Sequence, residues 1–179
     1  MRHFQKLAGV LGITGACWLA TSLPVSAEPF TAELRFDVKK SEPGQPNEYT
    51  KLEFADGSNR YVALVRRSGR VVSRGMLRDA TVQEWGFHEV TLGPEPNGRG
   101  TGYLVIVRGP SNIIYLKTQL RQLSLSRKGD EQHSVFTGLW EVSGATGEFK
   151  GLQGAGTLRI NRLSESERQW ILDGETSKP

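Results

Sequence analysis

The residues best suited to acid–base chemistry gather in one short segment, Glu84-Trp85-Gly86-Phe87-His88-Glu89. An imidazole titrates near neutral pH, so His88 could act as a general base or hold a ligand by a hydrogen bond. Side chains alternate between the two faces of a strand, which places Glu84 and His88 on one face and Glu89 on the other. Glu84 and His88 are then roughly 13 Å apart along the strand, too far for a hydrogen bond. The sequence therefore predicts that any acid–base partner of His88 comes from a neighbouring strand.

His88 and Glu84 are the candidate catalytic residues, and a structural role is open to both. A hydrogen-bonded histidine inside the protein needs no catalytic function, and this interpretation is favoured for His88. Aromatic side chains offer a broad apolar surface that either packs a core or contacts a ligand. The candidates for ligand contact are Trp85, Trp140, Tyr103 and Tyr115. For Trp140, filling of the core is the favoured role.

Several other kinds of catalysis lack the residues that they need. The single cysteine, Cys17, falls in a segment that we expect to be removed, which leaves no thiol chemistry. No Gly-x-Ser-x-Gly motif is present to hold a serine nucleophile. His88 and His133 have no Cys or second His close by in the sequence, so a zinc site is not expected. The sequence therefore predicts neither a metal nor a cofactor.

The densest group of positive charges consists of Arg66, Arg67, Arg70, Arg74 and Arg78. In an extended chain a spacing of four places Arg70, Arg74 and Arg78 on one face. Such a face could dock an anionic partner, as in an envelope protein-interaction module. A solvated outer face that resists aggregation is the simpler interpretation.

Residues 1–27 have the composition of a secretory signal peptide. Two basic residues, Arg2 and Lys6, precede an apolar run that ends at Leu23. This run is too short and too rich in glycine for a stable membrane anchor. We expect cleavage after Ala27 and a periplasmic or secreted mature protein.

Removal of this leader leaves residues 28–179, which suffice for a single domain and are too few for a second sizeable core. The leader carries two basic residues and no acidic residue, so its loss lowers the net charge from +4 to +2. A nucleic-acid-binding role is therefore not indicated.

Apolar and polar residues alternate in short segments, the pattern of strands with one buried face, as from Phe30 to Val38. Turn-forming residues separate the segments, for example at Ser68-Gly69 and from Gly93 to Gly100. A single helical turn is expected from Ser164 to Gln169, which resembles a capping box. About eight to ten strands at this spacing leave no room for βαβ crossovers. The sequence predicts an all-β fold, an antiparallel eight-stranded barrel that is closed or nearly closed, because closure removes exposed edges.

The most distinctive segment, Thr137 to Leu158, is rich in glycine. Its spacing does not fit a phosphate cradle, since it contains no Gly-x-x-x-x-Gly-Lys-Ser/Thr and no Gly-x-Gly-x-x-Gly that opens a helix. A structural role is favoured, because glycines permit positive φ, bulges and a tightly curled barrel wall.

The same segment resembles the hairpin near the C-terminus of the allene oxide cyclase/dirigent-like barrel superfamily. The matching residues are Trp140, Gly144, Thr146, Gly147, Phe149, Gly151, Gly154, Gly156 and Thr157. Ala145 replaces the usual second glycine, and a weaker match extends over Gly102 to Leu163. The resemblance implies an eight-stranded antiparallel barrel with an elongated interior, and a trimer as the homo-oligomer.

The resemblance does not carry an activity to this chain. Plant members cyclise a fatty-acid epoxide or steer phenoxy-radical coupling, but their catalytic carboxylates have no match here. The favoured hypothesis is a non-enzymatic exported barrel that binds a small hydrophobic ligand or has a structural role. The alternative is a cofactor-free isomerase or cyclase of the allene oxide cyclase type, which requires an ionisable side chain such as His88 or Glu84 to line an interior pocket.

Overall fold

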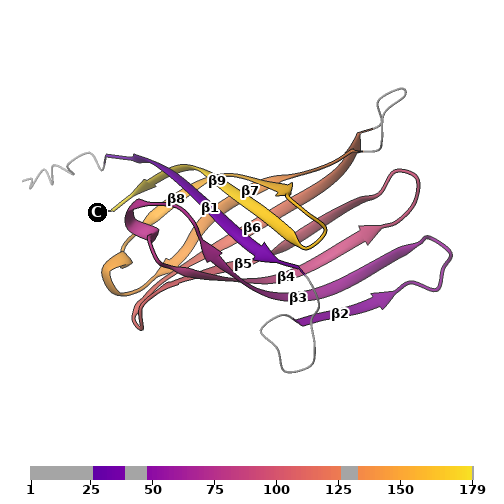
Figure 1. The fold of residues 1–179 in the computed structure, drawn as a ribbon, viewed down its shortest axis with the longest axis horizontal. Helices are drawn as coiled ribbons and strands as arrows, with labels where there is room; N and C mark the ends of the chain where they lie inside the picture. The colour runs from indigo at the N-terminus through magenta and orange to yellow at the C-terminus, as the bar shows by residue number, and fades with distance from the viewer. Residues whose placement is uncertain (1–25, 39–47, 126–132, 179) are drawn as a thin grey trace, which may run out of the picture.

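The computed structural model describes residues 26–38, 48–125 and 133–178, and nearly all of them lie in antiparallel strands (Figure 1). The strands are β1 (Glu28–Asp37), β2 (Glu48–Glu53), β3 (Arg60–Val71), β4 (Thr81–Thr91), β5 (Asn97–Arg108), β6 (Asn112–Leu125), β7 (His133–Ala145), β8 (Gln153–Arg162) and β9 (Glu167–Ser177). Two 3-10 turns, η1 (Gly75–Leu77) and η2 (Gly147–Phe149), complete the described secondary structure. No helix within these ranges is long and apolar enough to cross a membrane.

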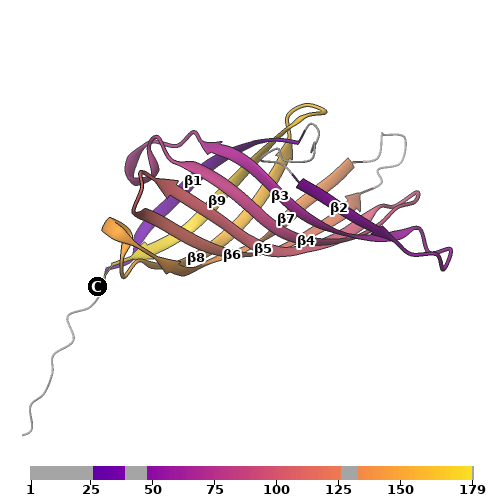
Figure 2. The same cartoon turned by 90° about the horizontal axis from the view of Figure 1, so that it is seen from below.

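Eight of the strands close into a barrel. Hydrogen bonds join them in the order β1-β9-β8-β7-β6-β5-β4-β3, and a further antiparallel pairing of β1 with β3 closes the ring. The strands run obliquely around the long axis of the barrel (Figure 2). The predicted eight-stranded antiparallel barrel is therefore confirmed, with β2 as an additional strand beside β3.

Along the edge opposite to β4, strand β3 pairs with two different strands. Its first part, Tyr61 to Arg66, pairs with β2, and its last part, Gly69 to Val71, pairs with β1. The predicted turn at Ser68-Gly69 is wrong, because β3 continues through these residues. Gly69 is needed at this point for a different reason: a Cβ there would lie 2.4 Å from the backbone oxygen of Arg35 on β1. The missing side chain allows β1 to approach closely enough to close the barrel.

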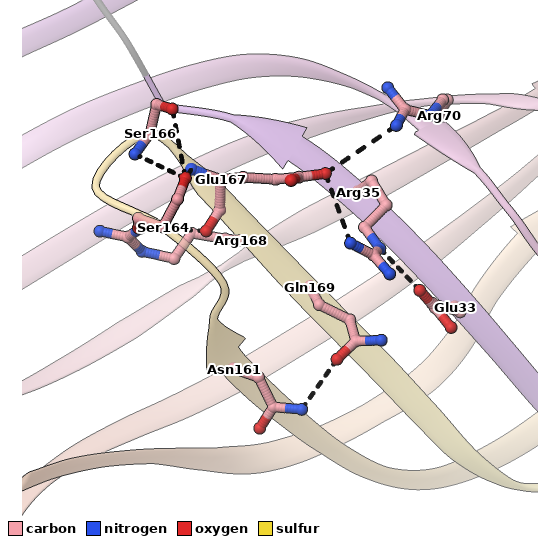
Figure 3. A network of polar contacts seen from close by, with 9 residues as sticks. All are labelled: Glu33, Arg35, Arg70, Asn161, Ser164, Ser166, Glu167, Arg168 and Gln169. Carbon is pink, nitrogen blue, oxygen red and sulfur yellow. Dashed lines mark hydrogen bonds and ion pairs between the residues drawn. The ribbon is translucent and has the colours of Figure 1, made fainter.

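A polar network covers the closure on the outer face (Figure 3). The Arg35 guanidinium on β1 contacts Glu33 at 2.6 Å and Glu167 of β9 at 3.4 Å, and Arg70 of β3 lies 3.9 Å from the same Glu167 carboxylate. Hydrogen bonds from Gln169 and Arg35 lower the pKa of Glu33. The network joins the three strands that meet at the closure, although pairs as exposed as these contribute little stability individually.

The apolar core fills the end of the barrel at which β1 and β3 pair. It contains Phe30, Leu34, Phe36, Leu104, Ile106, Ile114, Leu116, Trp140, Leu158, Trp170 and Leu172, with smaller residues between them. The ring centroids of Phe30 and Trp140 are 5.1 Å apart, and those of Phe36 and Trp170 are 5.3 Å apart, both in tilted contacts. Trp140 is 2% exposed and donates its indole N–H to the backbone oxygen of Asp173, so it has the core role favoured for it.

Two further local predictions are wrong. The predicted loop from Gly93 to Gly100 is shorter, because β5 begins at Asn97. Residues 164–166 form the turn between β8 and β9 instead of a helical turn, and residues 167–169 already belong to β9. The Ser164 hydroxyl does accept hydrogen bonds from the backbone N–H groups of Ser166 and Glu167, as a helix cap would (Figure 3). The chain then enters β9 directly, because the Leu163 N–H bonds to the Glu167 oxygen.

The predicted leader falls outside the described residues except for Ser26 and Ala27, and β1 begins at the next residue, Glu28. The polar segment 39–47 between β1 and β2 is likewise outside them.

We expect Gly138→Ala to lower the free energy of unfolding by at least about 2 kcal/mol, the cost of forcing atoms into a packed wall. A Cβ at Gly138 would lie 1.9 Å from the backbone oxygen of Gln119 on the neighbouring strand. Gly144→Ala on the same strand is the control, because its Cβ would meet nothing nearer than a Tyr115 ring atom at 3.8 Å. Urea denaturation of both variants measures the difference, and equal stabilities would contradict the packing argument.

Candidate functional site

A cavity of about 520 Å³ lies inside the barrel, at the end away from the closure. Its volume is typical of small-molecule sites, which occupy roughly 300–1,000 Å³. The apolar side chains that line it are Val38, Val90, Leu120, Phe136, Ile160 and Trp170. Ile160 and Trp170 also belong to the core, so the packed half of the barrel forms the floor of the cavity.

The inward positions of β5 explain why this end is hollow. Gly98 and Gly100 line the cavity, whereas Leu104 and Ile106, further along the same strand, are fully buried in the core. Side chains on one face of a strand recur every second residue, so these residues share the inward face. The interior is therefore empty where β5 carries glycines and filled where it carries large aliphatic side chains.

A buried carboxylate lies beside the cavity, between two basic side chains. The side chain of Glu84 is 4% exposed. Its Oε2 is 3.2 Å from the Arg67 Nη1 of β3, which faces it across the sheet, and its Oε1 is 3.1 Å from the His88 Nε2. Arg67 and His88 both line the cavity. The structure thus gives Glu84 one partner from its own strand and one from its neighbour.

The predicted separation of Glu84 and His88 is wrong, although the predicted shared face is right. Strand pairing runs through Gly86 without a bulge, so the alternation of faces is kept. A Cβ at Gly86 would lie 2.9 Å from the His88 Nε2 and 3.3 Å from the Glu84 Oε1. A Cβ at Gly100 would lie 3.0 Å from the His88 Cδ2. Because Gly86 and Gly100 have no Cβ atoms, the His88 imidazole can lie over Gly86 and reach the Glu84 carboxylate.

The contact between His88 and Glu84 is close but poorly directed. Among the described residues the buried Glu84 Oε1 has no hydrogen-bond partner, although the imidazole nitrogen is within reach. An unpaired buried oxygen costs free energy, and catalytic hydrogen bonds are often misaligned before a ligand binds. A small rotation of His88 would turn this contact into a hydrogen bond that orients the ring. The pair has the composition of a general base and its orienting carboxylate.

Two tyrosines bring hydroxyl groups to the rim of the cavity. Tyr49 of β2 and Tyr61 of β3 are hydrogen-bonded to each other and both line the cavity. Partial burial, and next the hydrogen bond with Tyr61, raise the pKa of Tyr49. Its phenol therefore stays neutral and can donate or accept a hydrogen bond at physiological pH.

The four aromatic candidates for ligand contact lie away from this cavity. Trp140 is in the core, while Trp85, Tyr103 and Tyr115 face outward with 47%, 42% and 36% of their surface exposed. Trp85 faces Tyr103 across β4 and β5. Side chains alternate along a strand, so Trp85 points outward whereas Glu84 and His88, on the same strand, point inward.

Sequence reasoning missed the cavity residues Tyr49, Tyr61, Arg67 and Arg168. A usable signal existed for one of them. Ala63, Val65 and Arg67 alternate as one face of β3, and the first two are buried. The assumed break at Ser68-Gly69 hid the fact that Arg67 continues this inward row.

The arginine cluster does not form one face. β3 ends at Val71 and η1 follows, so Arg70, Arg74 and Arg78 are not on a common strand, and their predicted alignment is wrong. Arg78 pairs locally with Asp79 at 3.4 Å. The chain turns here because Asp79 takes a positive φ of 61° and Gly75 one of 83°, which interrupts the extended backbone.

Within the described part of the chain, no group of three or more His, Cys, Asp or Glu side chains is arranged to hold a metal ion. The polar groups at the cavity include an imidazole–carboxylate pair, two phenols and arginines.

No protein-family model matches this chain, and no curated protein sequence matches it. Among solved structures, a beta-barrel-like protein from Acinetobacter baumannii AYE aligns over 89% of this chain and 99% of its own, with 12% sequence identity and a TM-score of 0.50. The two proteins share a barrel fold. At this identity the likeness shows the fold alone. The pterocarpan synthase dirigent protein GePTS1 aligns over 98% of this chain and 97% of its own, with 13% identity and a TM-score of 0.49.

We expect Glu84→Ala to lower the free energy of unfolding by about 3 kcal/mol, because it leaves the largely buried Arg67 without its counter-charge. The matched control is Glu141→Ala, which breaks an exposed pair with Lys117 and should change stability by less than about 1 kcal/mol. Urea denaturation at pH 7 measures both values. A Glu84 variant as stable as the control would show that the buried pair is not needed for folding.

Proposed function

We propose that this barrel is an exported binding protein that holds a small, mostly apolar molecule in its interior cavity without a cofactor. The observation that carries the proposal is the cavity itself, which combines apolar walls and a packed floor with polar and charged side chains that could orient a ligand. An eight-stranded barrel is just wide enough to be filled by side chains or to hold one small ligand. Here both outcomes occur in one barrel, one at each end.

Leu120→Trp should fill the cavity and weaken ligand binding at least about tenfold, since Leu120 projects into it. The probe is N-phenyl-1-naphthylamine, a neutral aromatic dye whose fluorescence rises in apolar sites. Leu139→Trp makes the same chemical change on the outer face, where Leu139 is 58% exposed, and should leave dye affinity unchanged. Circular dichroism and thermal melting confirm that both variants fold.

Native mass spectrometry of the protein purified from its host then identifies the molecule that it carries and the oligomeric state. A wild-type protein that neither carries a small molecule nor binds the dye would overturn the binding proposal. Equal dye affinities of the two tryptophan variants would place the bound dye elsewhere on the molecule.

A second candidate function is a cofactor-free isomerase, and the contact of His88 with Glu84 beside the cavity favours it. In such a reaction the His88 imidazole would take a proton from one carbon of the ligand and return it to another, with no net gain or loss of atoms. Glu84 would stabilise the imidazolium in between.

We expect an isomerase of this kind to exchange ligand protons with solvent. The ligand recovered from the wild-type protein is incubated with it in D2O, and deuterium uptake at carbon is followed by mass spectrometry. His88→Asn should lose at least about a hundredfold in exchange rate, the usual contribution of a general base. Uptake that is absent from the wild type, or unchanged in the His88 variant, leaves binding alone as the function.

A further inference from the structure

Arg168 of β9 reaches the cavity with part of its guanidinium uncommitted. Its Nη1 donates to the backbone oxygens of Ser164 at 2.8 Å and Glu167 at 3.1 Å, which fix the side chain at the turn between β8 and β9 (Figure 3). No hydrogen bond from Nε or Nη2 to a described residue accompanies these two. A guanidinium has five N–H donors, so a planar edge of the group is free to bind a ligand.

The charges around the cavity do not balance at Arg168. The other two arginines that line the cavity each have an acid: Arg67 has Glu84 at 3.2 Å, and Arg99 has Glu89 at 2.8 Å. Among the described residues no carboxylate lies within 4.0 Å of the Arg168 guanidinium. Within the described ranges, the Arg168 guanidinium is therefore a charge at the cavity without a carboxylate partner.

Like charges surround this group instead. Arg162 of β8 is its partner across the strand pair, and like charges in that position repel. Burial, and next the positive charges of Arg162 and Arg67, lower the pKa of Arg168. A bound anion would relieve this repulsion, because it would add the missing negative charge where three guanidinium groups approach one another.

The remainder of the lining fits a planar apolar body. Four of the side chains around the cavity are aromatic: Tyr49, Tyr61, Phe136 and Trp170. Aromatic rings favour tilted or offset contacts with other rings beyond the gain from burying their area.

We propose, resting on the binding function above, that the ligand is an aromatic acid whose anionic group pairs with Arg168 and whose rings lie among the cavity's aromatic side chains. Arg168 then selects for charge and the apolar walls select for shape. A partly buried hydrogen bond to a charged group discriminates by about tenfold or more.

Displacement of N-phenyl-1-naphthylamine tests the proposal with two competitors of the same shape. 2-Naphthoate carries the anionic group, and naphthalene-2-carboxamide replaces it with a neutral amide. The wild-type protein should bind the naphthoate about tenfold or more tightly than the carboxamide. Arg168→Gln should abolish this difference while the affinity for the neutral dye is retained, which shows that the cavity is intact.

Arg159→Gln is the matched control, because it removes the same charge from an exposed position on β8. It should keep the preference for the anion. Equal affinities of the two competitors in the wild type, or a preference that survives in the Arg168 variant, would overturn the inference. Decanoate tests the aromatic part, and tighter binding of decanoate than of 2-naphthoate would contradict it. Failure of the wild type to bind the dye at all would count against the binding function itself, so the two failures are distinguishable.

Discussion

The structure depends on the pairing of β1 with the last residues of β3. This pairing closes the sheet on itself, and it is possible only because position 69 has no side chain to collide with the backbone of β1. Only three residue pairs take part in it. From Tyr61 to Arg66, the earlier part of β3, the strand pairs with β2 instead. Because β3 pairs with β2 there, Tyr49 and Tyr61 lie at the end of the barrel that contains the cavity.

Side-chain volume along single strands divides the interior into two compartments. On β5 the change from glycine to leucine and isoleucine occurs within a few residues. The same glycines that leave space for a ligand let His88 lie back over Gly86 onto Glu84. The hollow and its ionisable pair therefore have one cause, the absence of Cβ atoms from the inward face of β4 and β5.

Alternation of apolar and polar residues was enough to predict the barrel, because strands with one buried face share this pattern. Closure into a barrel then pairs the backbone N–H and C=O groups that an open sheet would expose on its edge strands. The site was harder to predict. The shared face of Glu84 and His88 follows from alternation, but their contact depends on side-chain conformation and on Gly100 of another strand. The turn at Ser164, which anchors Arg168, resembles a helix cap locally, and only the hydrogen bonding of β8 with β9 decides between the two.

Strand β2 gives the sheet an edge at which another chain could add. Among the described strands it pairs with β3 alone, and all six of its residues are exposed. Three of the six, Glu48, Lys51 and Glu53, are charged, and charged side chains on an outermost strand oppose the ordered stacking of one molecule on the next. The protein can thus leave this edge unpaired without becoming a template for fibrillar self-association.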